Sequence, residues 1–152
     1  MNSLKAILQH AWWKLLLLTL LYAWISVINM WFGSSFFIAI IYGAIIGWMV
    51  TKTLFNANVP ISFSYIITAL ITTFGCLYIQ FALYTSMMVW DVSILPARIL
   101  ENLQMIANAG SEVGGYVVEG PIKFEGKGYY VQWIVESVLV VISSIVSAKL
   151  TE

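Results

Sequence analysis

The chain has 152 residues and a formal net charge of zero; 61% of its residues are hydrophobic, 15% are aromatic and 9% are charged. Soluble domains have about a quarter of their residues charged, so this composition excludes a soluble enzyme, a nucleic-acid-binding protein with a basic face and a disordered chain. It predicts an integral membrane protein.

The positions of the charged residues divide the chain into apolar runs and one polar connection. More than half of the charged side chains lie between positions 90 and 128, and most of the others lie at the ends of apolar runs. A hydrocarbon core about 30 Å thick requires about 20 mostly apolar residues in a helix. The runs of this length are about 12–31, 35–55, 62–89 and 129–149. We therefore predict an all-α membrane protein, a four-transmembrane-helix bundle that forms a single domain over residues 1–152.

The first apolar run has the basic flank of a signal peptide, because Lys5 and Lys14 precede a run of leucines. No small-x-small cleavage site follows it, so we predict a helix that is retained. Short breaks are expected after it, at 33–35, and after the second run, at 56–60. The third connection, about 90–128, is the one long polar segment.

Positive charge is concentrated on the side of the membrane that both termini would share. Four spans place the two ends of the chain together, along with Lys5, Lys14, Lys52 and Lys149. Cytoplasmic loops and tails carry an excess of Lys and Arg, so we expect both termini to be cytoplasmic. The general pattern is that of a small bacterial inner-membrane protein.

Small residues mark the packing face of two helices. Ala39, Gly43 and Gly47 recur every four residues in the second run, and Ser137 and Ser144 lie in the fourth. Small residues at this spacing allow helix backbones to approach closely. The pattern favours close packing strongly and homodimerisation only weakly.

Glu136 is the charged residue that falls within an apolar run, about six residues past Tyr130. That spacing places it roughly 9 Å below the outer interface. A carboxylate at a helix centre costs about 2.5–3.5 kcal/mol on insertion scales, so Glu136 is expected to face the bundle or a wet cavity. Gln132 lies one turn above it on the same face.

The third run carries a matching polar stripe at four-residue spacing. Gln80 lies in that stripe at about the depth of Glu136, so we predict a contact between the two side chains. Tyr42, with Ser26 and Asn29, is expected to complete an outer-leaflet polar layer.

This candidate intramembrane polar site has two interpretations. Its side chains hold the helices in register, at about 0.6–2 kcal/mol for each contact, or Glu136 binds a cation or proton on a pathway. A single acid without a second intramembrane charge makes a poor relay, which favours the structural role.

The polar connection is predicted to contain an amphipathic helix over 91–110. Leu95, Ile99, Leu103 and Ile106 recur at three- and four-residue spacing, and Pro96 suits the first turn. This apolar stripe is expected to lie on the bilayer surface or on its own bundle, with partner docking as the alternative. Residues 116–125 alternate as in a small β-hairpin-like flap.

No motif or residue constellation predicts catalysis. The sequence has no HExxH, no GxSxG and no Cys–His couple at one depth, and its single cysteine, Cys76, excludes a multi-cysteine metal site. We therefore predict a non-enzymatic protein without metal or cofactor.

Three functions remain compatible with the sequence. The leading hypothesis is an accessory or interaction subunit of a membrane complex, with the lipid bilayer and another membrane protein or a second copy as partners. An oligomeric transport or channel subunit with its site around Glu136 is the alternative. A third option is lipid or quinone handling by the amphipathic helix and by belts of aromatic residues at the ends of the apolar runs, which include Trp12, Trp13, Trp31, Trp90, Tyr129, Tyr130 and Trp133.

Overall fold

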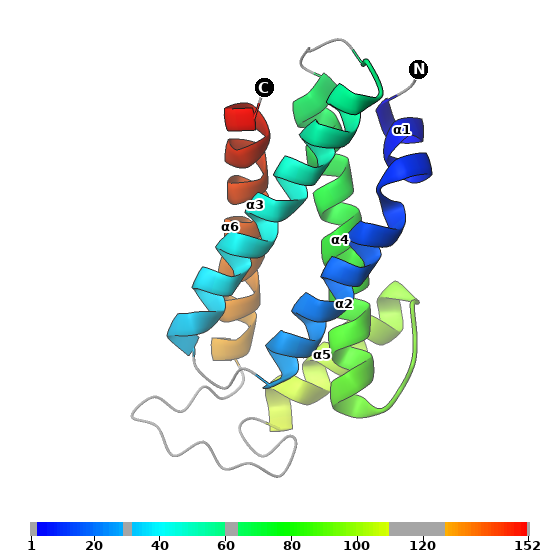
Figure 1. Ribbon diagram of the computed structural model, residues 1–152. Helices are drawn as coiled ribbons and strands as arrows, with labels where there is room; N and C mark the ends of the chain where they lie inside the picture. Colours follow the sequence, from blue (N-terminus) through cyan, green and yellow to red (C-terminus); the bar gives the residue numbers. More distant parts are fainter. Residues whose placement is uncertain (1–2, 29–31, 60–63, 110–126, 152) are drawn as a thin grey trace.

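The computed structural model describes residues 3–28, 32–59, 64–109 and 127–151, and within these ranges the chain is α-helical without strands. Its helices are α1 (Ser3–His10), α2 (Trp12–Ile28), α3 (Phe32–Asn56), α4 (Ser64–Val89), α5 (Pro96–Ala109) and α6 (Lys127–Thr151). The long helices α2, α3, α4 and α6 lie alongside one another, with the two termini at one end and α5 at the other (Figure 1).

Three helices in the described ranges are long and apolar enough to cross a membrane. Their spanning segments are Ser34–Asn56, Tyr65–Val89 and Gly128–Thr151. α1 and α2 satisfy the same criterion only as a pair, and they are bent by 70°. The helices thus fit an integral membrane protein with three spans, or with four if the bent pair crosses as one.

The bend between α1 and α2 lies at Ala11 and keeps its backbone hydrogen bonds. The Ala11 N–H donates to the Ile7 carbonyl at 2.9 Å, and the Leu15 N–H donates to the Ala11 carbonyl at 3.0 Å. Ala6, Ile7 and Ala11 are buried against the bundle. α1 was not predicted from the sequence, because its eight residues are too few for a hydropathy window to detect.

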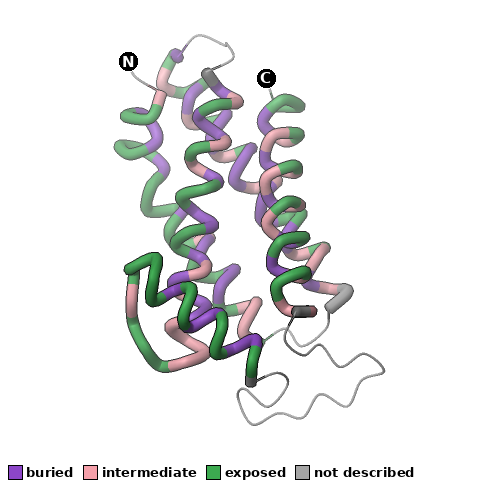
Figure 2. Tube along the Cα trace, turned by 180° about the vertical axis from the view of Figure 1, so that it is seen from behind, coloured by how far each residue is buried: buried purple, intermediate pink, exposed green. Residues whose placement is uncertain are grey.

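α4 is the centre of the bundle, because it packs against α2, α3, α5 and α6. The most extensive pairing joins α3 to α6, whereas α2 touches α3 much less. Several polar side chains are buried between the helices, whereas many large apolar side chains are exposed. The exposed positions lie along the outer faces of the helices (Figure 2). An apolar exterior of this kind suits lipid surroundings.

Two glycines allow α3 and α6 to meet at backbone contact. A Cβ atom on Gly43 would lie 2.9 Å from the Val140 carbonyl carbon and collide with its oxygen. A Cβ atom on Gly47 would collide in the same way with the Ser144 carbonyl. The interface between α3 and α6 therefore has no room for a side chain at Gly43 or at Gly47.

Hydrogen bonds between the same two helices accompany this close approach. The Ser147 hydroxyl donates to the Ala44 carbonyl at 2.7 Å, and the Thr51 hydroxyl donates to the Ala148 carbonyl at 3.3 Å. Such bonds to backbone carbonyls require the backbones to be near one another, so they are a consequence of the glycine contacts.

The end of α3 is a Schellman motif centred on Asn58, which has a φ of 52°. The Val59 N–H donates to the Leu54 carbonyl at 3.1 Å, and the Asn58 N–H donates to the Phe55 carbonyl at 3.0 Å. Asn tolerates this left-handed conformation better than most residues, which makes it a helix stop. The break expected at 56–60 begins here, and Tyr65 of α4 donates to the Val59 carbonyl at 2.7 Å.

Other expected boundaries differ from the structure. Residues 33–35 lie in the first turn of α3 and do not break it, because small residues are tolerated in membrane helices. α5 begins at Pro96 and not at residue 91, since a proline at the first helical position fixes the start. The flap predicted at 116–125 and Asn29 lie outside the described residues.

Candidate functional site

The polar pocket is a cavity of about 30 Å³ among α2, α3, α4 and α6. Each of the four long helices contributes to it, so residues far apart in the sequence converge there. Its lining residues are Ser26, Ser35, Gln80, Tyr84, Gln132, Trp133 and Glu136. The structure thus brings together Glu136, Gln132 and Gln80, three of the four residues of the candidate intramembrane polar site.

Glu136 is 9% exposed, and its carboxylate accepts a hydrogen bond from the Gln132 amide at 2.8 Å. The two residues are four positions apart on α6 and therefore share a helix face. The Gln132 amide also lies 3.4 Å from the Ser35 hydroxyl of α3. Gln132 consequently links the carboxylate to a second helix.

Gln80 of α4 is 5% exposed and lines the same cavity. Within the described ranges, no hydrogen bond joins Gln80 to Glu136. A volume of about 30 Å³ equals the share of one water molecule in the liquid. The polar pocket is therefore small, with room for a water-sized group between its polar side chains.

Tyr42 lies apart from the polar pocket. Its hydroxyl forms a hydrogen bond of 2.8 Å with the Thr19 hydroxyl of α2, and its ring stacks on Tyr22 with a centroid distance of 4.1 Å. These contacts join α2 to α3, and Tyr42 is not among the residues that line the polar pocket. The position of the Tyr42 side chain depends on how α3 is rotated about its own axis, which the periodicity of the sequence alone does not determine.

Aromatic rings surround Trp133 beside the pocket. Tyr84 of α4 meets its ring edge-on at 6.2 Å, while Tyr129 and Tyr130 lie 5.7 and 5.6 Å from it. Edge-to-face pairs of this kind contribute about 0.5–1.5 kcal/mol each. The Tyr84–Trp133 pair joins α4 to α6, whereas Tyr129 and Tyr130 contact Trp133 within α6.

Thr73, which was not among the predicted site residues, forms a further interhelical contact. The Thr73 and Ser144 hydroxyls are 2.8 Å apart between α4 and α6, and Thr73 also donates to the Ala69 carbonyl at 2.7 Å. Their signal in the sequence was a hydroxyl residue within an apolar run. Of the predicted packing residues, Ala39 and Ser144 are buried and Ser137 is half-buried.

α5 packs through its apolar face against the end of the bundle opposite the termini (Figure 1). Ile99, Leu103 and Ile106 are buried in a cluster with Tyr84 of α4 and Trp133 of α6. Three of the four stripe residues are therefore covered by the protein itself. Leu95, the fourth, is exposed.

The remaining apolar residues around α5 form an exposed surface that we call the apolar rim. It begins where α4 ends, passes through the connection and continues onto the outer face of α5. The rim residues are Trp90, Val92, Ile94, Leu95 and Leu100. The segment is held in place, because the Tyr78 hydroxyl of α4 donates to the Ile94 carbonyl and the Ser93 hydroxyl accepts from the Leu95 N–H at 3.2 Å.

Trp90 is the most exposed member of the apolar rim, at 92%, and its φ is 59°. Its N–H still donates to the Ser86 carbonyl at 3.0 Å, so it closes the last turn of α4. A bulky residue in the left-handed region costs about 1–2 kcal/mol, and glycine is the usual choice there.

Among the residues whose positions are described, no three His, Cys, Asp or Glu side chains converge on a site that could hold a metal ion. Comparison with protein-family models, curated proteins and solved structures finds no match. The site geometry is therefore the basis for any functional conclusion.

Proposed function

We propose that this protein is a non-catalytic accessory subunit of a membrane complex, with four spans and both termini in the cytoplasm of a bacterium. In this proposal α1 and α2 cross the inner membrane as one bent span. The apolar rim and α5 then lie on the extracytoplasmic side, where the rim contacts another membrane protein.

The observation that carries this proposal is the exposed apolar rim beside a helix whose own apolar face is already covered. Ile99 and Ile106 are buried where α5 packs on the bundle. The apolar rim is a second apolar surface, and it does not take part in this packing. Exposed apolar patches mark sites of contact with a protein or with a membrane, and the proposal assigns the rim to a protein partner. The tryptophan in a left-handed conformation supports the same conclusion, because strained backbone clusters at functional positions.

Site-specific photo-crosslinking in native membranes tests the proposal. A photoreactive amino acid at Leu100, in the apolar rim, is expected to form a crosslink to one distinct polypeptide. The matched control is Leu150, a leucine that is 83% exposed at the opposite end of the bundle. Crosslinks to lipid alone from Leu100, or equal protein crosslinks from both positions, would contradict the proposal.

A second candidate is an oligomeric transport subunit in which Glu136 and Gln80 line the path. The observation in its favour is a carboxylate that is 9% exposed among four apolar helices. The water-sized pocket requires the rest of the path to come from further copies. Glu136→Gln should reduce cation flux into reconstituted vesicles at least tenfold if this function holds; unchanged flux removes it.

A further inference from the structure

An open groove lies between α2 and α3 at the end of the bundle that carries the termini. Its volume is about 680 Å³, within the range of roughly 300–1,000 Å³ that is usual for ligand pockets. It exists because α2 packs mainly on α4 and leaves α3 largely uncovered on this side. We call it the α2–α3 groove.

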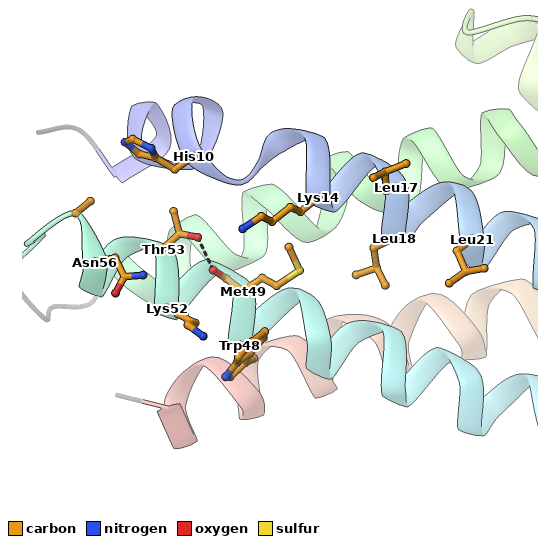
Figure 3. A pocket seen from close by; sticks show the side chains of 11 residues that line it. His10, Lys14, Leu17, Leu18, Leu21, Trp48, Met49, Lys52, Thr53 and Asn56 are labelled. Carbon is orange, nitrogen blue, oxygen red and sulfur yellow. Dashed lines mark hydrogen bonds between the residues drawn. The ribbon is translucent and has the colours of Figure 1, made fainter.

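Cationic side chains line the terminal end of the groove. Lys14 of α2 and Lys52 of α3 lie on its two walls, and His10 of α1 stands beyond them (Figure 3). The lining residues include no acid. Among the described side chains, the ion pair joins Arg98 to Glu101 at the other end of the protein, so neither lysine is neutralised in this way.

Each of the two lysines lies over a tryptophan ring. The Lys14 ammonium lies 5.4 Å from the Trp13 ring centroid, and the Lys52 ammonium lies 4.6 Å from that of Trp48. Trp favours the headgroup layer, because its ring is apolar and its N–H stays wet. A tryptophan beside each lysine favours headgroup depth for the two positive charges.

The groove continues from these charges along an apolar wall. Leu17, Leu18 and Leu21 follow Lys14 at three, four and seven positions, so they share one face of α2. Figure 3 shows the three leucines along α2, farther from the terminal end than Lys14. Met49 and Trp48 of α3 complete the wall. The groove is therefore cationic at its terminal end and apolar toward the middle of the membrane.

We propose that the α2–α3 groove binds one anionic phospholipid. The phosphate of the lipid lies between Lys14 and Lys52, and an acyl chain lies along Leu17, Leu18 and Leu21. Basic pockets between transmembrane helices on the cytoplasmic side recognise anionic headgroups, and the anionic lipids of that leaflet are the abundant occupants. Half of this site is apolar and opens sideways toward lipid, which favours a membrane lipid over a free anion.

The groove shares no residue with the apolar rim or with Glu136, which lie toward the other end of the bundle. It rests on the proposed function only for the assignment of the terminal end to the cytoplasmic side. Failure of lipid binding would therefore leave the partner-binding role of the rim standing, and failure of the rim crosslink would leave the lipid site standing.

Native mass spectrometry of the full-length protein in mild detergent tests the proposal. The protein is titrated with dioleoyl phosphatidylglycerol and, separately, with dioleoyl phosphatidylcholine, and the bound lipid is counted. Wild type is expected to prefer the anionic lipid. Charge removal should lower its affinity about fivefold for Lys14→Gln or Lys52→Gln and about 30-fold for the double variant.

The matched charge control is the double variant Lys5→Gln, Lys149→Gln, which removes two lysines from the same end outside the groove. It should keep the wild-type preference. Equal losses in both double variants would mean a general surface-charge effect and would overturn the site. Millimolar inorganic phosphate should not displace the bound phosphatidylglycerol. If phosphate displaced it, the groove would be a site for free anions, and the proposal would be overturned.

A second pair of variants tests the acyl chain. Leu17→Trp fills the groove, whereas Leu16→Trp places the same ring on the exposed neighbouring position that does not line it. Lipid binding should fall at least tenfold in Leu17→Trp and stay unchanged in Leu16→Trp. Binding that is equal in the two variants would place the lipid elsewhere. Thermal unfolding of each variant without added lipid separates loss of binding from loss of folding.

Discussion

Single glycines determine how closely the two most extensively paired helices approach. Gly43 and Gly47 sit where α6 leaves no space for a Cβ atom, and the small-residue spacing in the sequence pointed to these positions. The periodicity of one helix identifies such a face. It does not identify the partner, which is why the pairing of α3 with α6 had to come from the structure.

Gly43→Ala is expected to destabilise the protein by about 1–3 kcal/mol, because the added methyl collides with backbone atoms that cannot move aside. The control is Gly75→Ala on α4, where a Cβ atom would meet nothing within 4 Å. That change should be neutral or stabilising by up to about 1 kcal/mol, since alanine favours helix over glycine. Equilibrium unfolding in mixed micelles compares the two variants; equal effects would contradict the backbone contact.

The Thr73–Ser144 contact is expected to hold α4 and α6 together by about 0.6 kcal/mol, the average for hydrogen bonds between membrane helices. Thr73→Val and Ser144→Ala, separately and combined, give the coupling energy from the same unfolding assay. A coupling energy indistinguishable from zero would show that each hydroxyl is satisfied by its own helix alone, as the 2.7 Å bond from Thr73 to the Ala69 carbonyl permits.

The depth of the polar residues along their helices could be predicted from the sequence. Counting 1.5 Å per residue placed Gln80 and Glu136 at one level, and both line the pocket. Tyr42 was assigned to the same layer, yet it bonds to Thr19. Depth follows from sequence position, whereas the direction of a side chain around the helix axis depends on which neighbour it packs against.

Among the elements, α5 differs from the long helices because its 14 residues are fewer than a membrane span needs and because one apolar face holds it to the bundle. That face packs on α4 and α6 through Ile99, Leu103 and Ile106. The heptad-like spacing predicted the face, and the structure supplies the surface that covers it.

Ile106→Ser is expected to loosen α5 without unfolding the bundle, because it replaces a side chain that is 1% exposed with a small polar one. Loss of such buried apolar volume costs about 2–5 kcal/mol. Hydrogen–deuterium exchange should increase in α5 while α3 and α6 stay protected. Met105→Ser, at the neighbouring position that is 52% exposed, is the control and should change little. Uniform deprotection of all helices by Ile106→Ser would show that α5 is part of the global folding unit.

Hydropathy located the long helices well and the short elements poorly. The predicted runs 62–89 and 129–149 correspond to Ser64–Val89 and Lys127–Thr151, because a membrane span needs a length that few other segments reach. α1 was missed and the break at 33–35 was misplaced, since short helices and small residues leave no comparable signal in a window of about 20 residues.

At the scale of the whole molecule, the two ends of the bundle differ in chemistry. The terminal end carries Lys14 and Lys52 in the α2–α3 groove, and the other end carries the apolar rim with α5. α2 has 17 residues, about 25 Å of helix, which is shorter than a typical hydrocarbon core of about 30 Å. The proposal of four spans therefore depends on α1 completing the crossing of α2.

The number of spans decides whether the two termini lie on the same side of the membrane. An even number places them on one side, and an odd number places them on opposite sides. Cysteine accessibility in intact cells measures this directly, in a Cys76→Ser background. Lys5→Cys, Arg98→Cys and Lys149→Cys are each treated with a membrane-impermeant thiol reagent. Labelling of Arg98→Cys alone before lysis, and of all three after it, is the result expected for four spans with cytoplasmic termini. Labelling of Lys5→Cys and Lys149→Cys from opposite sides would contradict that topology.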